Sequence, residues 1–184
     1  FAKVSGGVDV FFVIAGFLIT TSLLRQVQRT GRLDVGRFLT RLGKRLLPAS
    51  LTVLAAVLVA TRVLMPFTRE EATYLEVVAS ALYLENWALA AKSVDYLARD
   101  EPSSPVQHFW AMSIQGQFYL LWIVVFGVAL ALRRREVQRS LGWVLTVLFA
   151  ASSAFSVYLT AANQPLAYFH TGTRVWEFAA GGLL

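Results

Sequence analysis

The carboxylate of Asp9 stands at the start of a mostly apolar stretch that continues to Leu24 and is followed at once by arginines. At about 1.5 Å of rise per residue, a helix over residues 8–24 is about 25 Å long, close to the thickness of a bilayer core. An ionisable group at the edge of a membrane is a candidate for chemistry. The alternative is an acid at a helix N-terminus, which the helix dipole stabilises by about 0.3–1 kcal/mol. The spacing alone favours this alternative.

Residues 33–47 carry arginines at every fourth position, beside an apolar stripe of the same period. This pattern predicts an amphipathic helix that lies in the membrane interface. Its cations can anchor the chain to anionic lipid, and arginine forks also suit phosphate groups. The two roles do not exclude each other, and both stay open. The arginines are Arg37, Arg41 and Arg45.

A third group of candidates begins near Trp110, where another long apolar stretch starts. Aromatic residues at this position are typical of the belt of side chains at a membrane interface. Gln115 would lie inside the span, where an amide needs hydrogen-bond partners. Arg174 and Glu177 are three residues apart, so one helix face would carry them as an ion pair. Within a membrane such a pair usually faces a cavity.

The composition limits the kind of protein that can position these side chains. The 184 residues are 57% hydrophobic and only 15% charged, which is too apolar for a typical soluble domain. Much of the positive charge lies in two runs beside apolar stretches, residues 25–45 and 133–139, as in cytoplasmic loops and not as in nucleic-acid binding. There is no cysteine and there are two histidines, so we expect no metal site.

Hydrophobic stretches long enough to cross a membrane predict four spans, over residues 8–24, 48–65, 110–132 and 141–162. Pro48 suits the first turn of the second span. Residues 70–91 have a helical pattern, 92–105 form a loop, 163–165 form a turn, and 174–184 open a further span. The chain starts without methionine and ends in an apolar run. We therefore expect residues 1–184 to be part of a single transmembrane domain, truncated at both ends.

The distribution of lysine and arginine predicts the direction of each span, because loops rich in these residues lie inside the cell. The first span then runs from outside to inside, the second returns, and the third runs inward again. Both ends of residues 67–107 lie outside, so their helical part should re-enter the membrane, lie at its interface or cross it twice. The candidates that fall near outer ends of spans are Asp9, His108, Gln115 and Arg174.

Four blocks of the sequence, in order, resemble the signature of the type 3 acyltransferase family, the integral membrane O-acyltransferases of bacterial surface glycans. They are GVDVFFVIAGFLI over residues 7–19, FLTR to RLLP over 38–48, HFW to QFYLLW over 108–122, and TRVWE over 173–177. Together the blocks span nearly the whole chain. One block would be a weak signal, whereas four in the right order are specific.

The resemblance implies a role for Asp9 and for the arginines. In this family the preceding helix supplies a catalytic histidine, and the aspartate is thought to orient it. An aspartate–histidine pair makes chemical sense, because the carboxylate raises the basicity of an imidazole that deprotonates a sugar hydroxyl. Arg41 and Arg45 fall on the second block, which implies that they cradle the phosphates of an acyl-coenzyme A together with Arg37 of the same stripe.

The resemblance also implies a wall for the acceptor site. The family more often has glutamate where Gln115 stands. An amide cannot take a proton at neutral pH, so Gln115 is expected to position the substrate and not to act as an acid or base. The fourth block places Arg174 and Glu177 at positions that recur in the family. The residues expected at the acceptor or site wall are His108, Trp110, Gln115, Tyr119, Arg174 and Glu177.

These observations predict an all-α multipass transmembrane helical bundle in a bacterial plasma membrane, with an interfacial amphipathic helix and a re-entrant helix among its elements. The expected reaction moves an acyl group, in the first place acetyl, from cytosolic acyl-CoA to a hydroxyl of a cell-envelope glycan or glycolipid. Acyl-CoA is a co-substrate, no cofactor is bound, and membrane lipid is the other partner. The alternatives are a transporter or flippase of lipid-linked sugars, and a structural remnant without activity.

Overall fold

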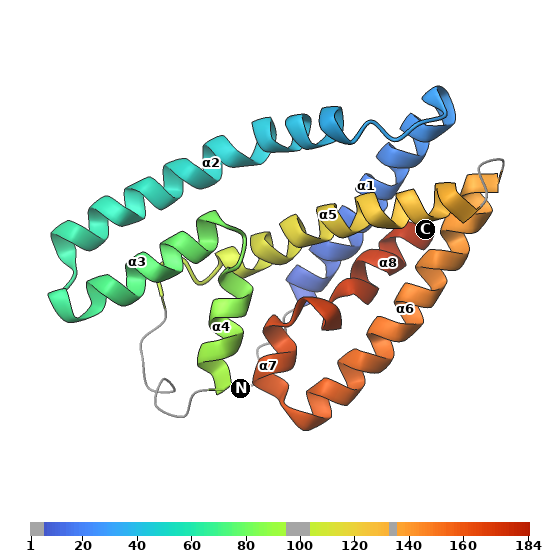
Figure 1. Ribbon diagram of the computed structural model, residues 1–184. Helices are drawn as coiled ribbons and strands as arrows, with labels where there is room; N and C mark the ends of the chain where they lie inside the picture. The colour runs from blue at the N-terminus through green and yellow to red at the C-terminus, as the bar shows by residue number, and fades with distance from the viewer. Residues whose placement is uncertain (1–5, 95–103, 133–135) are drawn as a thin grey trace.

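The computed structural model describes residues 6–94, 104–132 and 136–184, and within these ranges every regular element is a helix (Figure 1). The all-α prediction is therefore confirmed for this part of the chain. The elements are α1 (Gly6–Thr30), α2 (Val35–Leu64), α3 (Phe67–Ala81), α4 (Glu85–Val94), α5 (Phe109–Leu132), α6 (Val137–Ala162), α7 (Gln164–Phe169), the short 3-10 helix η3 (Thr171–Thr173) and α8 (Val175–Leu183).

Four of these helices, α1, α2, α5 and α6, are long and apolar enough to cross a membrane. They correspond to the four predicted spans. The end of α1 and the start of α2 lie at the same end of the molecule as the end of α5 and the start of α6, on the right in Figure 1. One cavity of about 830 Å³ is lined by Gly31, which follows α1, and by Arg139 in the first turn of α6. The two basic runs therefore approach one end, as the prediction from charge requires, although residues 133–135 lie outside the described ranges.

The predicted boundary at Pro48 is wrong, because α2 is a single helix with this proline in its interior. Proline removes one backbone donor from a helix, here the partner of the carbonyl group of Lys44 four residues earlier, and membrane helices tolerate such a loss. The predicted amphipathic helix over residues 33–47 thus forms the N-terminal half of α2 and not a separate element.

The helical stretch predicted over residues 70–91 is divided into α3 and α4. The division lies at Tyr83, which has a φ of 59° and so reverses the chain in the left-handed region. Helix α3 has 15 residues and is about 23 Å long, and α4 has 10 residues and is about 15 Å long. Both are too short to cross a bilayer. The structure therefore does not support two crossings here. Most of the predicted loop over 92–105 lies outside the described ranges, and its first residues belong to α4, which continues to Val94.

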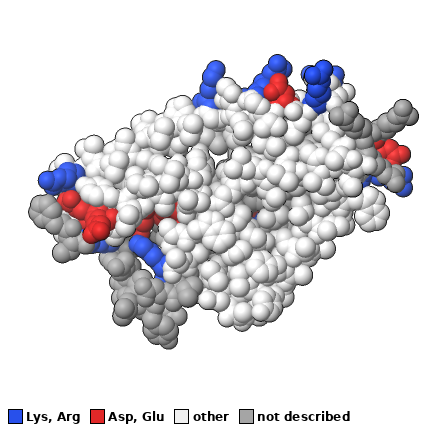
Figure 2. Space-filling model, viewed as in Figure 1, with Lys and Arg blue, Asp and Glu red and all other residues white. Residues whose placement is uncertain are grey.

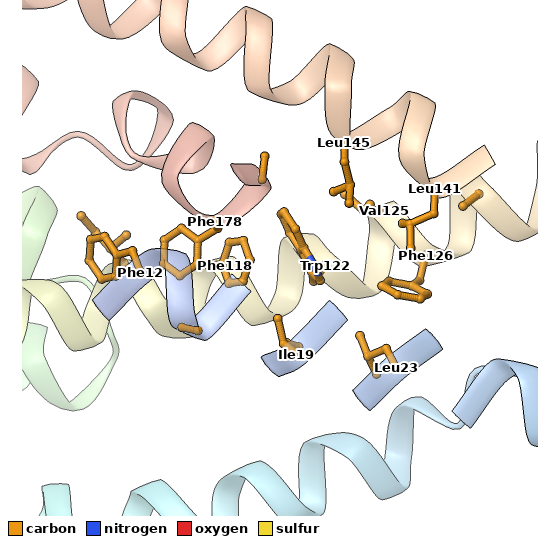
Figure 3. Close-up of a cluster of buried hydrophobic side chains, with 14 of the residues drawn as sticks. Phe12, Ile19, Leu23, Phe118, Trp122, Val125, Phe126, Leu141, Leu145 and Phe178 are labelled. Atoms are coloured by element: carbon orange, nitrogen blue, oxygen red, sulfur yellow. The ribbon is translucent and has the colours of Figure 1, made fainter. Parts of the chain in front are cut away.

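The core joins α1, α5, α6 and α8 through buried aromatic and aliphatic side chains (Figure 3). The ring of Phe178 from α8 stacks between Phe12 of α1 and Phe118 of α5, with centroid distances of 4.6 and 3.5 Å. The buried indole of Trp122 donates to Thr20 Oγ1 at 2.7 Å. Since polar groups in a dry core need such partners, this bond fixes the register of α5 against α1.

Glycines allow α1 and α8 to approach each other closely. A side chain at Gly16 would meet the carbonyl group of Phe178, and one at Gly181 would meet the carbonyl group of Val13. Small residues serve this purpose in membrane helix pairs, because they let two backbones touch. The pair runs in the same direction, since the first turn of α1 lies beside the first turn of α8. This contact brings two distant segments together at the start of both helices.

Candidate active site

Arg174 lies at the start of α8 and bonds three groups from three parts of the chain. Its Nη1 atom donates to Asp9 Oδ1 and to Glu177 Oε1, both at 2.8 Å. Its Nε atom donates to the carbonyl oxygen of Tyr168 at 3.3 Å. The guanidinium carbon also lies 5.0 Å from the ring centre of Tyr168 and 5.9 Å from that of Trp110. The structure thus gathers four of the predicted site residues into one cluster.

The cluster has one cation between two carboxylates, and its members differ in their exposure. The side chain of Glu177 is 1% exposed and that of Arg174 is 12% exposed, whereas that of Asp9 is 38% exposed. Within the described ranges, the second oxygen of Glu177 has no hydrogen-bond partner. Removing the arginine would leave a buried charge without a partner, which is strongly destabilising. Asp9 is therefore the part of the cluster that a substrate or another side chain can reach.

A second set of predicted residues lines a cavity of about 380 Å³ between α1, α2 and α5. Arg41 and Arg45 contribute from α2, and Gln115 and Tyr119 contribute from α5. The wall on the side of α1 is largely apolar. The cavity therefore combines positive charge and hydrogen-bonding groups with an apolar surface, a mixture typical of small-molecule sites.

Two further predicted residues lie apart from both places. The exposed side chain of Arg37 forms an ion pair with Asp34 at 3.3 Å, one turn before the arginines that line the cavity. Figure 2 shows the basic side chains along the edge that α2 forms, at the top of the view. His108 is exposed, and its ring packs against the neighbouring Phe109. Among the described residues, the structure brings His108 into no contact with the Arg174 cluster.

A partly buried amide network that the sequence did not predict centres on Gln117. Its Nε2 atom donates to Asn86 Oδ1 and to the carbonyl oxygen of Tyr83, both at 2.8 Å. Its Oε1 atom accepts from Thr171 Oγ1 at 2.6 Å and from the indole of Trp87 at 3.2 Å. All four hydrogen-bonding positions of the amide are thus occupied, so the network is structural. The sequence feature that could have indicated the network is the amide of Gln117 inside a predicted span, where it needs hydrogen-bond partners.

This network positions the segment that presents Arg174. Asn86 donates to the carbonyl oxygen of Phe169 at 3.1 Å and to Thr171 Oγ1 at 3.0 Å, so α4 and α5 hold the connection between α7 and α8. Thr173 Oγ1, which is buried, lies within hydrogen-bonding distance of the carbonyl oxygens of Ala167 and His170, both at 2.6 Å. Side-chain bonds of this kind fix a short connection between two helices. The guanidinium therefore enters the cluster from a rigid support.

His170, which the sequence did not single out, lies in the same connection. Its Nδ1 atom accepts from the backbone of Gly172 at 3.0 Å, and its ring lies edge-on to those of Trp87 and Phe155. Partial burial lowers the pKa of this histidine below its ordinary value, so the neutral form prevails at pH 7. Because Nδ1 is an acceptor, the neutral ring carries its proton on Nε2 and acts there as a donor.

Comparison with known proteins identifies the family of the chain. Residues 4–184 match the type 3 acyltransferase family model, which is described as an acyltransferase domain. Over 179 residues the chain is 31% identical to proteins named O-acetyltransferase OatA in Staphylococcus aureus strains NCTC 8325 and COL. The match covers 97% of this chain and 29% of each relative, so the chain spans less than a third of their length. No solved structure matches significantly. The chain therefore belongs to the type 3 acyltransferase family.

Proposed function

We propose that the full-length protein is a membrane O-acyltransferase. It moves an acyl group, in the first place acetyl, from cytosolic acyl-CoA to a hydroxyl of a cell-envelope glycan or glycolipid. Membership of the family and the relatives named O-acetyltransferases support acyl transfer. The observation that carries the proposal is the cavity in which Arg41 and Arg45 face the same space as Gln115 and Tyr119.

The cavity is the proposed site of the acyl donor. Guanidinium groups bind phosphate with two parallel hydrogen bonds, and coenzyme A carries phosphates at one end and a thioester at the other. Arg41 and Arg45 are one helical turn apart, so they present two such forks on one face. The apolar residues of α1 and the amide and phenol of α5 can then line the path of the pantetheine arm.

The Arg174 cluster is the proposed site of the acceptor. Sugar hydroxyls are bound by charged groups that donate and accept hydrogen bonds, and aromatic rings such as those of Trp110 and Tyr168 can cover a sugar face. Asp9 is the exposed carboxylate of the cluster. We propose that it orients the imidazole of a histidine from the helix that precedes it in this family, and that this imidazole deprotonates the acceptor hydroxyl.

The proposed location is a bacterial plasma membrane. The basic runs at the α1–α2 and α5–α6 connections would face the cytosol, where acyl-CoA is available. The starts of α1 and α8, with the Arg174 cluster, would then face outward, where glycans are acylated. A donor from one side and an acceptor from the other can meet because α1 extends from the cluster along the cavity wall.

The experiment that tests this function measures two products of the full-length protein in proteoliposomes. With radiolabelled acetyl-CoA and a membrane fraction from the native host, we expect equal amounts of free CoA and of alkali-labile acetyl groups on glycan. Movement of a lipid-linked sugar across the bilayer without release of CoA would contradict the proposal and support a flippase. Hydrolysis of acetyl-CoA without any acylated glycan would also contradict it.

A further inference from the structure

The hydroxyl of Tyr119 is a hydrogen-bond donor that lies on the wall of the proposed donor cavity. Gln115, one turn earlier on α5, donates from Nε2 to this hydroxyl oxygen at 2.6 Å. Within the ranges that the structure describes, no side chain or backbone group accepts the phenol proton. An oxygen that already accepts a hydrogen bond is a better donor, because bonds in a chain polarise one another. The amide thus orients the phenol and strengthens it as a donor.

The position of this phenol is fixed before any ligand arrives. The Tyr119 ring is half-buried and lies edge-on to Phe38 of α2, with 6.3 Å between the ring centres. Gln115 and Tyr119 are four residues apart, so they share one face of a long helix and keep their separation. A donor held in this way costs no reorganisation when charge develops nearby, which makes it effective in catalysis.

We propose that Tyr119 is a catalytic residue whose hydroxyl binds the carbonyl oxygen of the thioester, and that Gln115 is its positioning residue. This inference rests on the proposed function, because it needs an acyl-CoA in the cavity. It adds what that function lacks, a group that stabilises the charge of the acyl-transfer step. The carboxylates of the Arg174 cluster cannot do so, since they only accept hydrogen bonds when ionised.

In the proposed step, the acceptor hydroxyl oxygen forms a bond with the carbonyl carbon, and the carbonyl electron pair moves to its oxygen. Tyr119 donates to the resulting oxyanion. When the pair returns, the carbon–sulfur bond breaks and coenzyme A leaves as a thiolate. The proton that the hydroxyl lost ends on this sulfur, so the products are the oxygen ester and free CoA thiol. The phenol keeps its own proton throughout and forms no covalent bond.

The test is the infrared carbonyl band of acetyl-CoA, labelled with ¹³C at the thioester carbonyl and bound to the full-length protein in nanodiscs. We expect the band to move to lower wavenumber on binding to the wild type and to return toward its solution position in Tyr119→Phe. Tyr158→Phe is the matched control, because Tyr158 is 69% exposed on α6 and does not line the cavity. In this control the band should stay at the wild-type position.

Kinetics give a second readout. We expect Tyr119→Phe to lower kcat for acetyl transfer about 10²-fold, as for the loss of one oxyanion donor, while KM for acetyl-CoA stays within about twofold. Gln115→Met, which keeps the shape without the amide, should move the band part of the way and slow the reaction less. Adding Gln115→Met to Tyr119→Phe should cause no further loss, because the amide acts through the phenol.

Three outcomes would overturn the inference. A band that keeps its wild-type position in Tyr119→Phe, with acetyl-CoA still bound, would remove Tyr119 from the reaction and leave the proposed function intact. If Tyr119→Phe fails to fold, an unmoved band in Gln115→Met has the same meaning. A wild-type protein that binds no acetyl-CoA would overturn the proposed function and this inference together.

Discussion

At the scale of single residues, Arg174 pairs with two carboxylates that differ in exposure. Glu177 is buried behind the guanidinium and neutralises it, whereas Asp9 remains partly exposed. Burial of a paired charge is tolerated, but burial of a lone charge is not, so the arginine and Glu177 form the structural half of the cluster. Asp9 can therefore be changed with less damage to the fold, which makes it the residue on which to test the chemistry.

We predict that Asp9→Asn in the full-length protein abolishes acyl transfer, with a loss of at least about 10²-fold, while the protein stays in the membrane. Asparagine keeps the shape of the side chain but loses the charge that supports an imidazolium. Asp34→Asn is the matched control, because Asp34 caps α2 on the exposed side and pairs only with Arg37 among the described residues. Wild-type acylation of glycan by Asp9→Asn would return Asp9 to a helix-dipole role.

The sequence predicts part of this cluster and not the rest, for a physical reason. Spacing on one helix determines which neighbours can touch, so the pairing of Arg174 with Glu177 follows from three residues of separation. Asp9 and Arg174 are 165 residues apart, and their bond depends on the packing of α1 against α8. The need of Gln117 for partners is likewise visible in the sequence, whereas the identity of those partners is a property of the fold.

At the scale of elements, the site depends on the contact between α1 and α8. We predict that Gly16→Ala or Gly181→Ala destabilises the protein by about 1–3 kcal/mol, because the new methyl group would meet the backbone of the other helix. Gly127→Ala is the control, since a methyl group there meets nothing within 4 Å. Thermal unfolding in detergent measures the effect. Equal stability of Gly181→Ala and Gly127→Ala would contradict the close approach.

Some helix boundaries differ from those that local sequence rules predict, because tertiary contacts determine them. Hydrophobic length predicts the four long helices, because a bilayer imposes the same requirement on each. The rule that places proline in a first turn fails at Pro48, since a membrane helix tolerates the loss of one backbone hydrogen bond in its interior. The break at Tyr83 carries no glycine or proline signal, and it is held by the bond from Gln117 to its carbonyl oxygen.

At the scale of the whole molecule, the two basic connections should lie on one side of the membrane and the segment before α5 on the other. We predict that single cysteines at Ser104 and at Gln138 react with an impermeant thiol reagent from opposite sides. The chain has no cysteine of its own, so each label reports one position. Labelling of both positions from the same side would contradict the topology, and with it the access of cytosolic acyl-CoA to the cavity.

The donor cavity belongs to this scale, because segments far apart in the sequence form it. The sequence shows Arg41 as part of an arginine stripe and Gln115 as a polar residue in an apolar span. That both line one cavity follows only from the packing of α2 beside α5. The same packing separates Arg37 from the arginines that line the cavity. Spacing alone does not distinguish the three arginines, since position on a stripe does not tell which turns face a neighbouring helix.

The central claim is that Arg41 and Arg45 bind the acyl donor, and the affinity of the full-length protein for acetyl-CoA tests it most directly. The variant that carries both Arg41→Ala and Arg45→Ala should have a Kd at least about 100-fold higher, because two lost charged contacts together cost about 3–6 kcal/mol. Arg37→Ala, on the same helix but outside the cavity, should leave the Kd unchanged.

Lysine at both positions keeps the charge that sets topology but loses the planar fork. The account predicts that the variant with Arg41→Lys and Arg45→Lys inserts normally into the membrane and still binds acetyl-CoA weakly in equilibrium binding to nanodiscs. Wild-type affinity in this variant, or an equal loss in Arg37→Ala, would show that the arginines only anchor the chain and that the donor binds elsewhere.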